Sequence, residues 1–133
     1  MRELVLPADK AAIPQATAWI DEELEKLDCP MKTQMQIELA VDEVLANIAM
    51  YAYPESSGTA TMRFCCTDRT AEIVFIDSGI PYNPLENPEP DVTLPAEKRK
   101  IGGLGIFLVR KMADEVLYRR EDGKNVLTVR KRI

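Results

Sequence analysis

The chain has 133 residues, of which 46% are hydrophobic and 29% charged, a balance typical of one globular domain. The net charge of −5 argues against nucleic acid as the main partner, because phosphate backbones require a basic protein surface. No histidine is present, which excludes Ser-His-Asp triads, Cys-His pairs and histidine zinc sites. Any catalysis therefore depends on carboxylates, amides, backbone groups or a metal ion held by oxygen.

The three cysteines, Cys29, Cys65 and Cys66, include no C-x-x-C pair, and we expect buried, reduced thiols. The first residues contain no signal-peptide pattern, and no apolar run approaches the roughly 20 residues of a membrane helix. We therefore expect a cytoplasmic protein without a membrane segment, folded as a single domain over residues 1–133.

Hydrophobic periodicity predicts the order of helices and strands. In chain order, we expect a strand at 2–6, helices at 10–27 and 32–52, strands at 59–67 and 71–77, a helix from the glycines near 103 to about 114, and a hairpin of strands 115–121 and 125–133. Helices and strands are partly segregated along the chain, which favours an α+β two-layer sandwich. We expect a mixed, largely antiparallel sheet covered by helices on one face.

Residues 80–101 differ in character from the rest of the chain. Five of the nine prolines lie between Pro81 and Pro95, together with several charged residues. A long irregular segment inside a small domain is usually either functional or disordered.

The helix predicted at 32–52 carries an unusual polar pair. An apolar stripe is formed by residues at helical spacing, namely Ile37, Val41, Val44, Leu45 and Ile48. Glu43 and Asn47 are four residues apart, so they lie on one face that borders this stripe. They are either boundary residues joined by a surface hydrogen bond or parts of a site, because an asparagine oxygen can ligate Mg²⁺ and a carboxylate can accept a proton.

The strand at 71–77 delivers Asp77 at its end, followed by Ser78 and Gly79. One interpretation is a plain Asp-Ser-Gly turn. The other is a ligand site, in which the carboxylate accepts a hydrogen bond from an amino group and Gly79 lets the backbone approach a flat ring.

The glycines at 102, 103 and 105 precede an apolar helix and suit either a phosphate cradle or a tight turn. A P-loop would require Lys and Ser or Thr after the last glycine, where Ile106 and Phe107 stand. A dinucleotide fingerprint would require glycine at position 108, which is Leu108. We expect Phe107, Leu108 and Met112 to pack in the core.

Together, Glu43…Asn47 on a helix, Asp77-x-Gly79 after a strand and Gly103-x-Gly105 before a helix resemble the three sequence boxes of the GHKL (Bergerat-fold) ATPases. Three segments, "LAVDEVLANIAMYAYP", "DSGIPYNP" and "GGLGIFLVRKMADEV", resemble the sequences of the bacterial anti-sigma regulatory factors, which are serine-protein kinases. The resemblance covers essentially the whole chain and implies a Bergerat-type ATP-binding domain.

The resemblance implies a role for each matching position. Glu43 would be the general base, Asn47 would ligate Mg²⁺, and Asp77 would read the adenine amino group with Gly79 beside the ring. The segment from Pro84 to Ile101 would be the ATP lid. The phosphates would meet the backbone at the start of the last helix and a lid lysine, through Lys100, Gly102, Gly103, Leu104 and Gly105. An alternative interpretation of the basic residues ending in Lys100 is that they form a solvated part of the surface and contact no phosphate.

The chain departs from the family pattern at two places. Many members have His-Ala-Tyr where this chain has Tyr51-Ala52-Tyr53. The final hairpin of the family often carries Gly-Thr, whose threonine supports the adenine site, where Lys124-Asn125 stands here. We expect Asn125 to supply a similar hydrogen bond.

The resemblance implies an ATP- and Mg²⁺-dependent kinase that phosphorylates a serine of a STAS-type anti-sigma-factor antagonist in a partner-switching system. It also implies a sigma factor as partner, a PP2C-type phosphatase that reverses the mark, and a homodimer, without nucleic acid or membrane. The alternative is a non-catalytic module of the same fold that acts only by sequestering a partner. A domain cut from a two-component sensor is disfavoured, because the chain has no histidine to phosphorylate.

Overall fold

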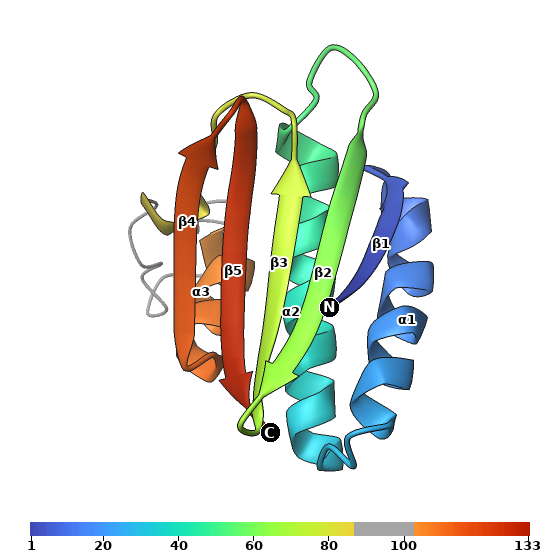
Figure 1. Cartoon of the computed structure of the whole chain (residues 1–133). Helices are drawn as coiled ribbons and strands as arrows, with labels where there is room; N and C mark the ends of the chain where they lie inside the picture. The colour runs from blue at the N-terminus through green and yellow to red at the C-terminus, as the bar shows by residue number, and fades with distance from the viewer. Residues whose placement is uncertain (87–102) are drawn as a thin grey trace.

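A computed structural model describes residues 1–86 and 103–133 of the chain (Figure 1). Its elements are β1 (Arg2–Pro7), η1 (Lys10–Ala12), α1 (Ile13–Glu25), α2 (Met31–Tyr51), β2 (Thr59–Thr67), β3 (Thr70–Asp77), η2 (Pro84–Glu86), α3 (Gly103–Met112), β4 (Glu115–Glu121) and β5 (Lys124–Arg132). The order matches the sequence prediction, apart from the two short 3-10 turns.

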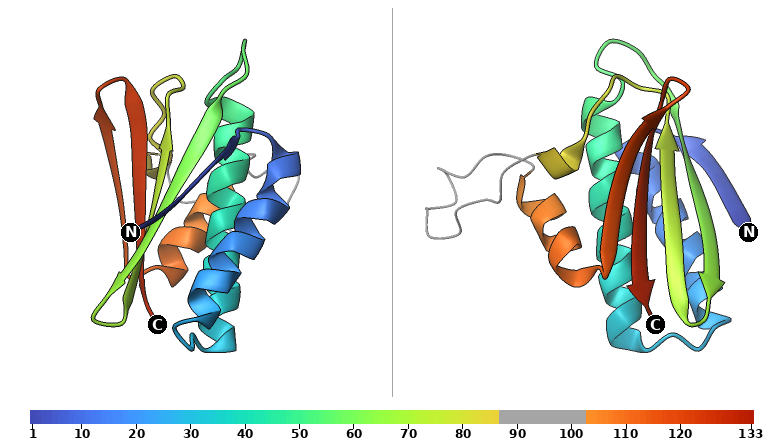
Figure 2. Two further views of the ribbon diagram at one scale, coloured as in Figure 1. Left: turned by 45° about the vertical axis from the view of Figure 1, so that its right-hand side comes forward. Right: turned by 60° about the vertical axis from the view of Figure 1, so that its left-hand side comes forward.

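The five strands form one sheet in the order β1-β2-β3-β5-β4, and all four pairings are antiparallel. The three α-helices cover one face of this sheet, with α3 behind β4 and β5 and α2 behind the centre (Figures 1 and 2). The expected α+β two-layer sandwich with helices on one face is confirmed. No parallel pairing occurs among the described strands, so the sheet is simpler than the mixed sheet that we expected.

The first helix begins later than its periodicity predicts. Asp9 caps a 3-10 turn by accepting a hydrogen bond from the Ala11 N–H at 3.0 Å. The α-helix starts at Ile13, with Pro14 in its first turn. Proline is favoured there because the first amides of a helix have no partner inside it. The helix runs to Glu25, short of the expected end at residue 27.

The core lies between α1, α2 and the inner face of the sheet. The predicted stripe of α2 is confirmed, since its five residues are all buried. From the sheet, the alternate positions of β2, β3 and β5 point toward the helices. Their buried apolar side chains are Ala60, Met62, Phe64, Ala71, Ile73, Phe75, Leu127 and Val129.

The core contribution of α3 differs from our expectation. Among its described side chains, those of Ile106 and Val109 are buried, at 4% and 1% exposed, whereas Leu108 is 40% exposed. The expectation of a buried Leu108 is therefore wrong, and Phe107 and Met112 are only half-buried. Ile106 and Val109 are three residues apart and share one helix face. The apolar run alone did not fix which face turns toward the sheet.

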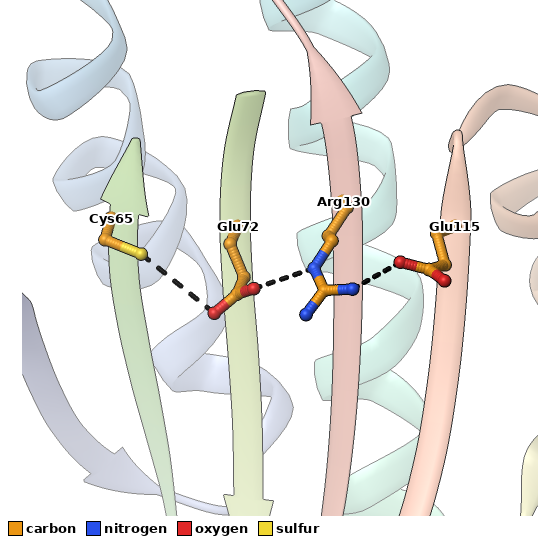
Figure 3. A network of polar contacts seen from close by, with 4 residues as sticks. All are labelled: Cys65, Glu72, Glu115 and Arg130. Atoms are coloured by element: carbon orange, nitrogen blue, oxygen red, sulfur yellow. Dashed lines mark hydrogen bonds and ion pairs between the residues drawn. The ribbon is translucent and has the colours of Figure 1, made fainter. Parts of the chain in front are cut away.

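The outer face of the sheet carries a chain of polar contacts at the end opposite to the β3 C-terminus (Figure 3). Arg130 donates to Glu72 at 2.7 Å and also binds Glu115, while the Cys65 thiol lies 4.0 Å from Glu72. These residues come from four adjacent positions across β2, β3, β5 and β4. All three cysteines are free, and they are half-buried rather than buried as we expected. Among the described residues, no helix combines the length and apolar character needed to cross a membrane.

Candidate nucleotide site

A small cavity lies where the second half of α2, the end of β3, the start of β5 and the start of α3 meet. Its volume is about 30 Å³. Its lining includes Val44, Asn47, Ile48, Ala52, Phe75, Asp77, Tyr82, Pro84, Ile106, Tyr118, Asn125 and Leu127. Three of the predicted site residues, Asn47, Asp77 and Asn125, therefore meet at one cavity although they lie far apart in the sequence.

Asp77 is the last residue of β3 and is only 6% exposed. Its Oδ1 accepts two hydrogen bonds at 2.9 Å, one from the Gly79 N–H and one from Asn125 Nδ2. The bond to Gly79 is the turn that the sequence Asp-Ser-Gly predicts. The two donors hold a buried carboxylate at the cavity, so the turn and the site occur together at this residue.

Asn125 faces Asp77 directly in the β3–β5 register. Besides Asp77, its Nδ2 donates to the Ile80 carbonyl at 2.8 Å. Its Oδ1 accepts from the Tyr82 N–H at 3.2 Å and from the Tyr118 hydroxyl at 2.5 Å. Asn125 therefore joins the adenine-site carboxylate expected at Asp77 to the segment that follows it.

Asn47 lines the same cavity from α2, and its amide is incompletely bonded. Asn47 Nδ2 is buried and has no hydrogen-bond partner within residues 1–86 and 103–133. An unpaired buried amide costs free energy in the free protein, which is typical of a group that meets a ligand. Because no described residue fixes this nitrogen, the amide can present either its nitrogen or its oxygen to a ligand.

Glu43 lies one turn before Asn47 on α2 and packs against the first turn of α3. A Cβ atom built on Gly105 would lie 2.0 Å from Glu43 Oε2. The absence of a side chain at Gly105 thus makes room for the carboxylate. Ile106, the next residue of α3, lines the cavity. The structure therefore brings the first and third sequence boxes into contact beside the second.

Gly79 also allows a close approach, but its neighbour is protein backbone. A Cβ atom at Gly79 would lie 2.2 Å from the carbonyl oxygen of Ala52, at the end of α2. The Ile80 N–H donates to the same carbonyl at 2.9 Å. A glycine is thus required here by the packing of the chain alone, whatever its role toward a ring.

Some predicted positions lie outside the described residues. These are Lys100, Gly102 and residues 87–101 of the expected lid. The first three residues of that lid, Pro84–Glu86, form η2. Gly103 begins α3, where the sequence predicted the helix to start, and the side chain of Leu104 is not described.

Two tyrosines at the cavity were missed by the sequence reasoning. Tyr118 reaches Asn125 diagonally across β4 and β5, because Tyr118 pairs with Leu127 in the register. Tyr82 contacts Tyr51, with ring centroids 5.4 Å apart. Alternation along β4 places Tyr118 on the inner face, which is the only signal that the sequence offers for it.

Comparison with known proteins agrees with this arrangement. A family model described as the histidine kinase-like ATPase domain matches residues 6–131. The chain therefore belongs to this family of GHKL-type domains, as its three sequence boxes predicted.

Among individual proteins, the chain is similar to enzymes named serine-protein kinase RsbW. The one from Bacillus mycoides (strain KBAB4) is 28% identical over 95 residues, covering 68% of this chain and 59% of the relative. Those from Bacillus cereus (strain B4264) and Bacillus thuringiensis (strain Al Hakam) are 28% and 27% identical over the same coverage. The chain thus spans less than two thirds of the length of these relatives.

Proposed function

We propose that the protein is an ATP- and Mg²⁺-dependent serine-protein kinase that acts as an anti-sigma regulatory factor. The observation that supports this most strongly is the meeting of Asn47 and Asp77 at one cavity, with Glu43 beside the start of α3. The similarity to kinases named RsbW supports the same reaction class.

In this proposal, the cavity beside Asp77 takes the adenine ring. Asp77 carries an oxygen that can accept a hydrogen bond from the exocyclic amine, and Phe75 and Leu127 supply apolar walls. A cavity of about 30 Å³ exceeds the ~10–15 Å³ that one ordered water molecule requires, but it is small for a base. The lining must therefore widen to admit the base, and η2 is the lining segment nearest to the undescribed residues.

The phosphates would lie toward Asn47 and the first turn of α3. Backbone N–H groups at a helix start favour anions, which suits Gly103, Gly105 and the residues beside them, with Lys100 and Gly102 nearby in sequence. Bound with the nucleotide, Mg²⁺ would neutralise phosphate charge, and the Asn47 oxygen is the side-chain ligand that we propose for it. Within the described part of the chain, no cluster of three acidic or cysteine side chains offers another metal site.

Glu43 would act as the general base. Its carboxylate would accept the proton of the partner's serine hydroxyl while the serine oxygen forms a bond to the γ-phosphorus. The bond from the γ-phosphorus to the bridging oxygen breaks, and ADP leaves with that oxygen. This reaction requires mainly positioning and charge neutralisation from the protein, which fits a site without histidine.

The proposed substrate is a serine on a STAS-type anti-sigma-factor antagonist. A sigma factor would be the sequestered partner, and a PP2C-type phosphatase would reverse the modification. We further propose that the protein acts as a homodimer in the cytoplasm.

The experiment is transfer of labelled phosphate from ATP to a candidate antagonist, followed by detection of phosphoserine. Glu43→Gln should abolish transfer while nucleotide binding persists. The matched control is Asp42→Asn, since Asp42 is the neighbouring carboxylate of α2 but faces away, toward Thr17 at 3.1 Å. Confirmed ATP binding without phosphoserine would exclude the kinase activity.

The second candidate is a non-catalytic module that holds a regulator. The observation that favours it is Asn125 in place of the threonine common in the family's final hairpin. Calorimetry gives the first answer: partner binding without any heat from ATP and Mg²⁺ supports the module. Where both bind, the phosphoserine assay decides, because a non-catalytic module can also hold ATP.

A further inference from the structure

The outer side of α2 is apolar where contact with water should favour polar residues. The three α-helices form one layer on the sheet, so among the described elements none covers their outer side (Figure 2). A helix in such a layer normally has one apolar face, which is turned toward the core. The helix α1 follows this pattern, since Gln15, Glu22 and Glu25 are exposed on it. The helix α2 has a second apolar face, which we call the outer stripe and which consists of Met31, Met35, Leu39, Ala46 and Met50.

The outer stripe is one continuous surface. Its residues follow one another at intervals of four, four, seven and four, which places them on one side of the helix over most of its length. All except Ala46 are exposed, with Met31 at 69% and Met35 at 61%. A contiguous apolar surface that stays in water marks an interaction site. Methionine side chains are flexible and fit irregular surfaces, which suits a protein partner.

The outer stripe runs beside Glu43, the proposed base. On a helix, the surface neighbours of a residue are three and four positions away. For Glu43 they include Leu39 and Ala46, which belong to the outer stripe, and Asn47, which lines the cavity. The Glu43 carboxylate itself packs against Gly105 of α3. A protein that covers the outer stripe therefore passes over the base, as the serine of a protein substrate must.

The border of the outer stripe toward α1 is acidic and is not neutralised. Asp21 and Glu25 of α1 and Glu38 of α2 form no ion pair within the described residues. Glu38 lies three positions after Met35, and Gln34 donates to Asp21 at 3.2 Å, so the border follows the contact between the two helices. Burial raises the pKa of Glu38, and the neighbouring Asp21 raises it further. A carboxylate whose ionised form is disfavoured in this way is stabilised when a lysine or arginine approaches.

We propose that the outer stripe is the surface on which the serine-bearing protein substrate docks, through an apolar face that carries lysine or arginine along the side toward α1. The inference rests on the proposed kinase function and adds to it the recognition of the protein substrate. Contacts along α2 position the substrate, and Glu43 meets its serine where the outer stripe passes the cavity. The residues of the outer stripe do not line the cavity, so nucleotide binding does not depend on them.

The test separates docking from chemistry. The probe is the unphosphorylated STAS-type antagonist of the same organism, which belongs to the substrate class proposed above. Its Kd is measured by calorimetry with ADP and Mg²⁺, so that no phosphoryl transfer takes place, and its KM and kcat are measured with ATP. In the double variant Met35→Gln, Leu39→Gln, we expect the Kd and KM for the antagonist to rise roughly tenfold or more. Glutamine is a good helix former, so the fold should persist. The kcat and the KM for ATP should stay within about twofold, because Glu43 and the cavity are unchanged.

Leu117→Gln is the matched control, since Leu117 is also exposed, at 43%, but lies on β4 at the outer face of the sheet. It should leave the Kd for the antagonist unchanged. An unchanged Kd in the double variant would overturn the docking surface while leaving the kinase activity intact. Wild-type protein that binds ADP but neither binds nor phosphorylates the antagonist would instead overturn the proposed function.

Light scattering of the double variant examines the other possible occupant, a second copy of this chain. If the oligomeric state changes and the antagonist binds as it does to wild type, a second copy covers the outer stripe and the proposal is wrong. An unchanged oligomeric state together with weaker antagonist binding is the result that we expect.

Glu38→Gln tests the acidic border. The affinity for the antagonist should fall by about two- to fivefold at low salt, and the difference from wild type should shrink as salt is added. Asp122→Asn, in the β4–β5 turn where φ is 52°, removes an equal charge in the other layer of the fold and should leave the affinity unchanged. Equal effects of the two changes would mean that net charge alone attracts the antagonist, and would overturn the basic side assigned to it.

Discussion

Asn125 lies opposite Asp77 in the β3–β5 register, and its Nδ2 donates to Asp77 Oδ1 at 2.9 Å. This relationship depends on the pairing of two strands that are 48 residues apart at this point. The candidate base site is thus part of the sheet, not of a loop, and the rigidity of the sheet is transmitted to the carboxylate.

We expect Asp77→Asn to weaken ATP binding by between tenfold and roughly a hundredfold. The new amide can keep its oxygen toward Gly79 and Asn125, and its nitrogen then faces the adenine amine, so that two donors meet. For the same reason, affinity for GTP relative to ATP should rise. Calorimetry with both nucleotides provides the measurement. Asp68→Asn, in the exposed β2–β3 turn where φ is 51°, is the control and should change neither affinity.

Asn47→Ala should leave the free protein at least as stable as wild type. The change removes a buried amide nitrogen that has no partner among the described residues, and alanine favours the helix by about 0.5 kcal/mol. Gln34→Ala is the contrasting variant on the same helix, because Gln34 donates to Asp21 at 3.2 Å. It should lose about 1 kcal/mol in urea denaturation.

In the same Asn47→Ala protein, the stabilisation by ATP should no longer increase when Mg²⁺ is added. A thermal melt with and without the metal measures this. A variant that is destabilised and still responds to Mg²⁺ would mean that Asn47 has a structural role and does not ligate the metal.

Gly79→Ala should destabilise the fold by about 1–3 kcal/mol, because the added methyl would lie 2.2 Å from the backbone carbonyl of Ala52. A backbone atom at the end of a long helix cannot move aside cheaply. Urea denaturation of the variant measures the loss. Wild-type stability would show that the end of α2 shifts freely.

Gly105→Ala should behave differently. Its methyl meets the flexible end of Glu43, which can swing away, and alanine is favoured over glycine in a helix by up to about 1 kcal/mol. We expect a folded protein of equal or higher stability whose phosphoserine formation falls by roughly tenfold or more, since the displaced carboxylate is the proposed base. Unchanged phosphoserine formation would show that Glu43 is not the base in the reaction.

The sheet's outer face offers a test of local electrostatics at Cys65 (Figure 3). Burial raises the pKa of the Cys65 thiol, and the Glu72 carboxylate raises it further, while Arg130 lowers it. Because the thiolate is the reactive form, alkylation at pH 8 should be slower than for an unperturbed cysteine. Glu72→Gln should lower the pKa and speed the reaction.

Arg130→Met should have the opposite effect on Cys65 and slow its alkylation. The measurement is the rate of iodoacetamide labelling against pH in a protein whose other cysteines are replaced by Cys29→Ser and Cys66→Ala. If Glu72→Gln and Arg130→Met change the alkylation rate in the same direction, loosening of the strands and not charge would determine the reactivity of the thiol.

Regular patterns predicted most of the fold. The 3.6-residue stripe of α2 and the alternation of β2 and β3 are strong because each element contributes one face to the core, and both appear as expected. The orientation of α3 was not predictable in this way. Ile106 through Val109 is apolar at every position, so no periodicity distinguishes the buried Ile106 from the exposed Leu108.

The candidate site was predicted residue by residue but not as a network. Spacing placed Glu43 and Asn47 on one helix face, and strand prediction placed Asp77 at a strand end. The pairing of β3 with β5 is non-local, and no short turn fixes it, so the bonds of Asn125 to Asp77 and Tyr118 required the structure.

The central claim, that the cavity beside Asp77 and Asn47 binds ATP with Mg²⁺, is tested most directly by calorimetric titration of the wild-type protein, supported by a thermal melt. We predict saturable binding that is weakened in Asp77→Asn. At a nucleotide concentration of 100 times the Kd, the folded state should gain about 2.7 kcal/mol. Absence of both heat and thermal stabilisation at millimolar ATP and Mg²⁺ would contradict the claim.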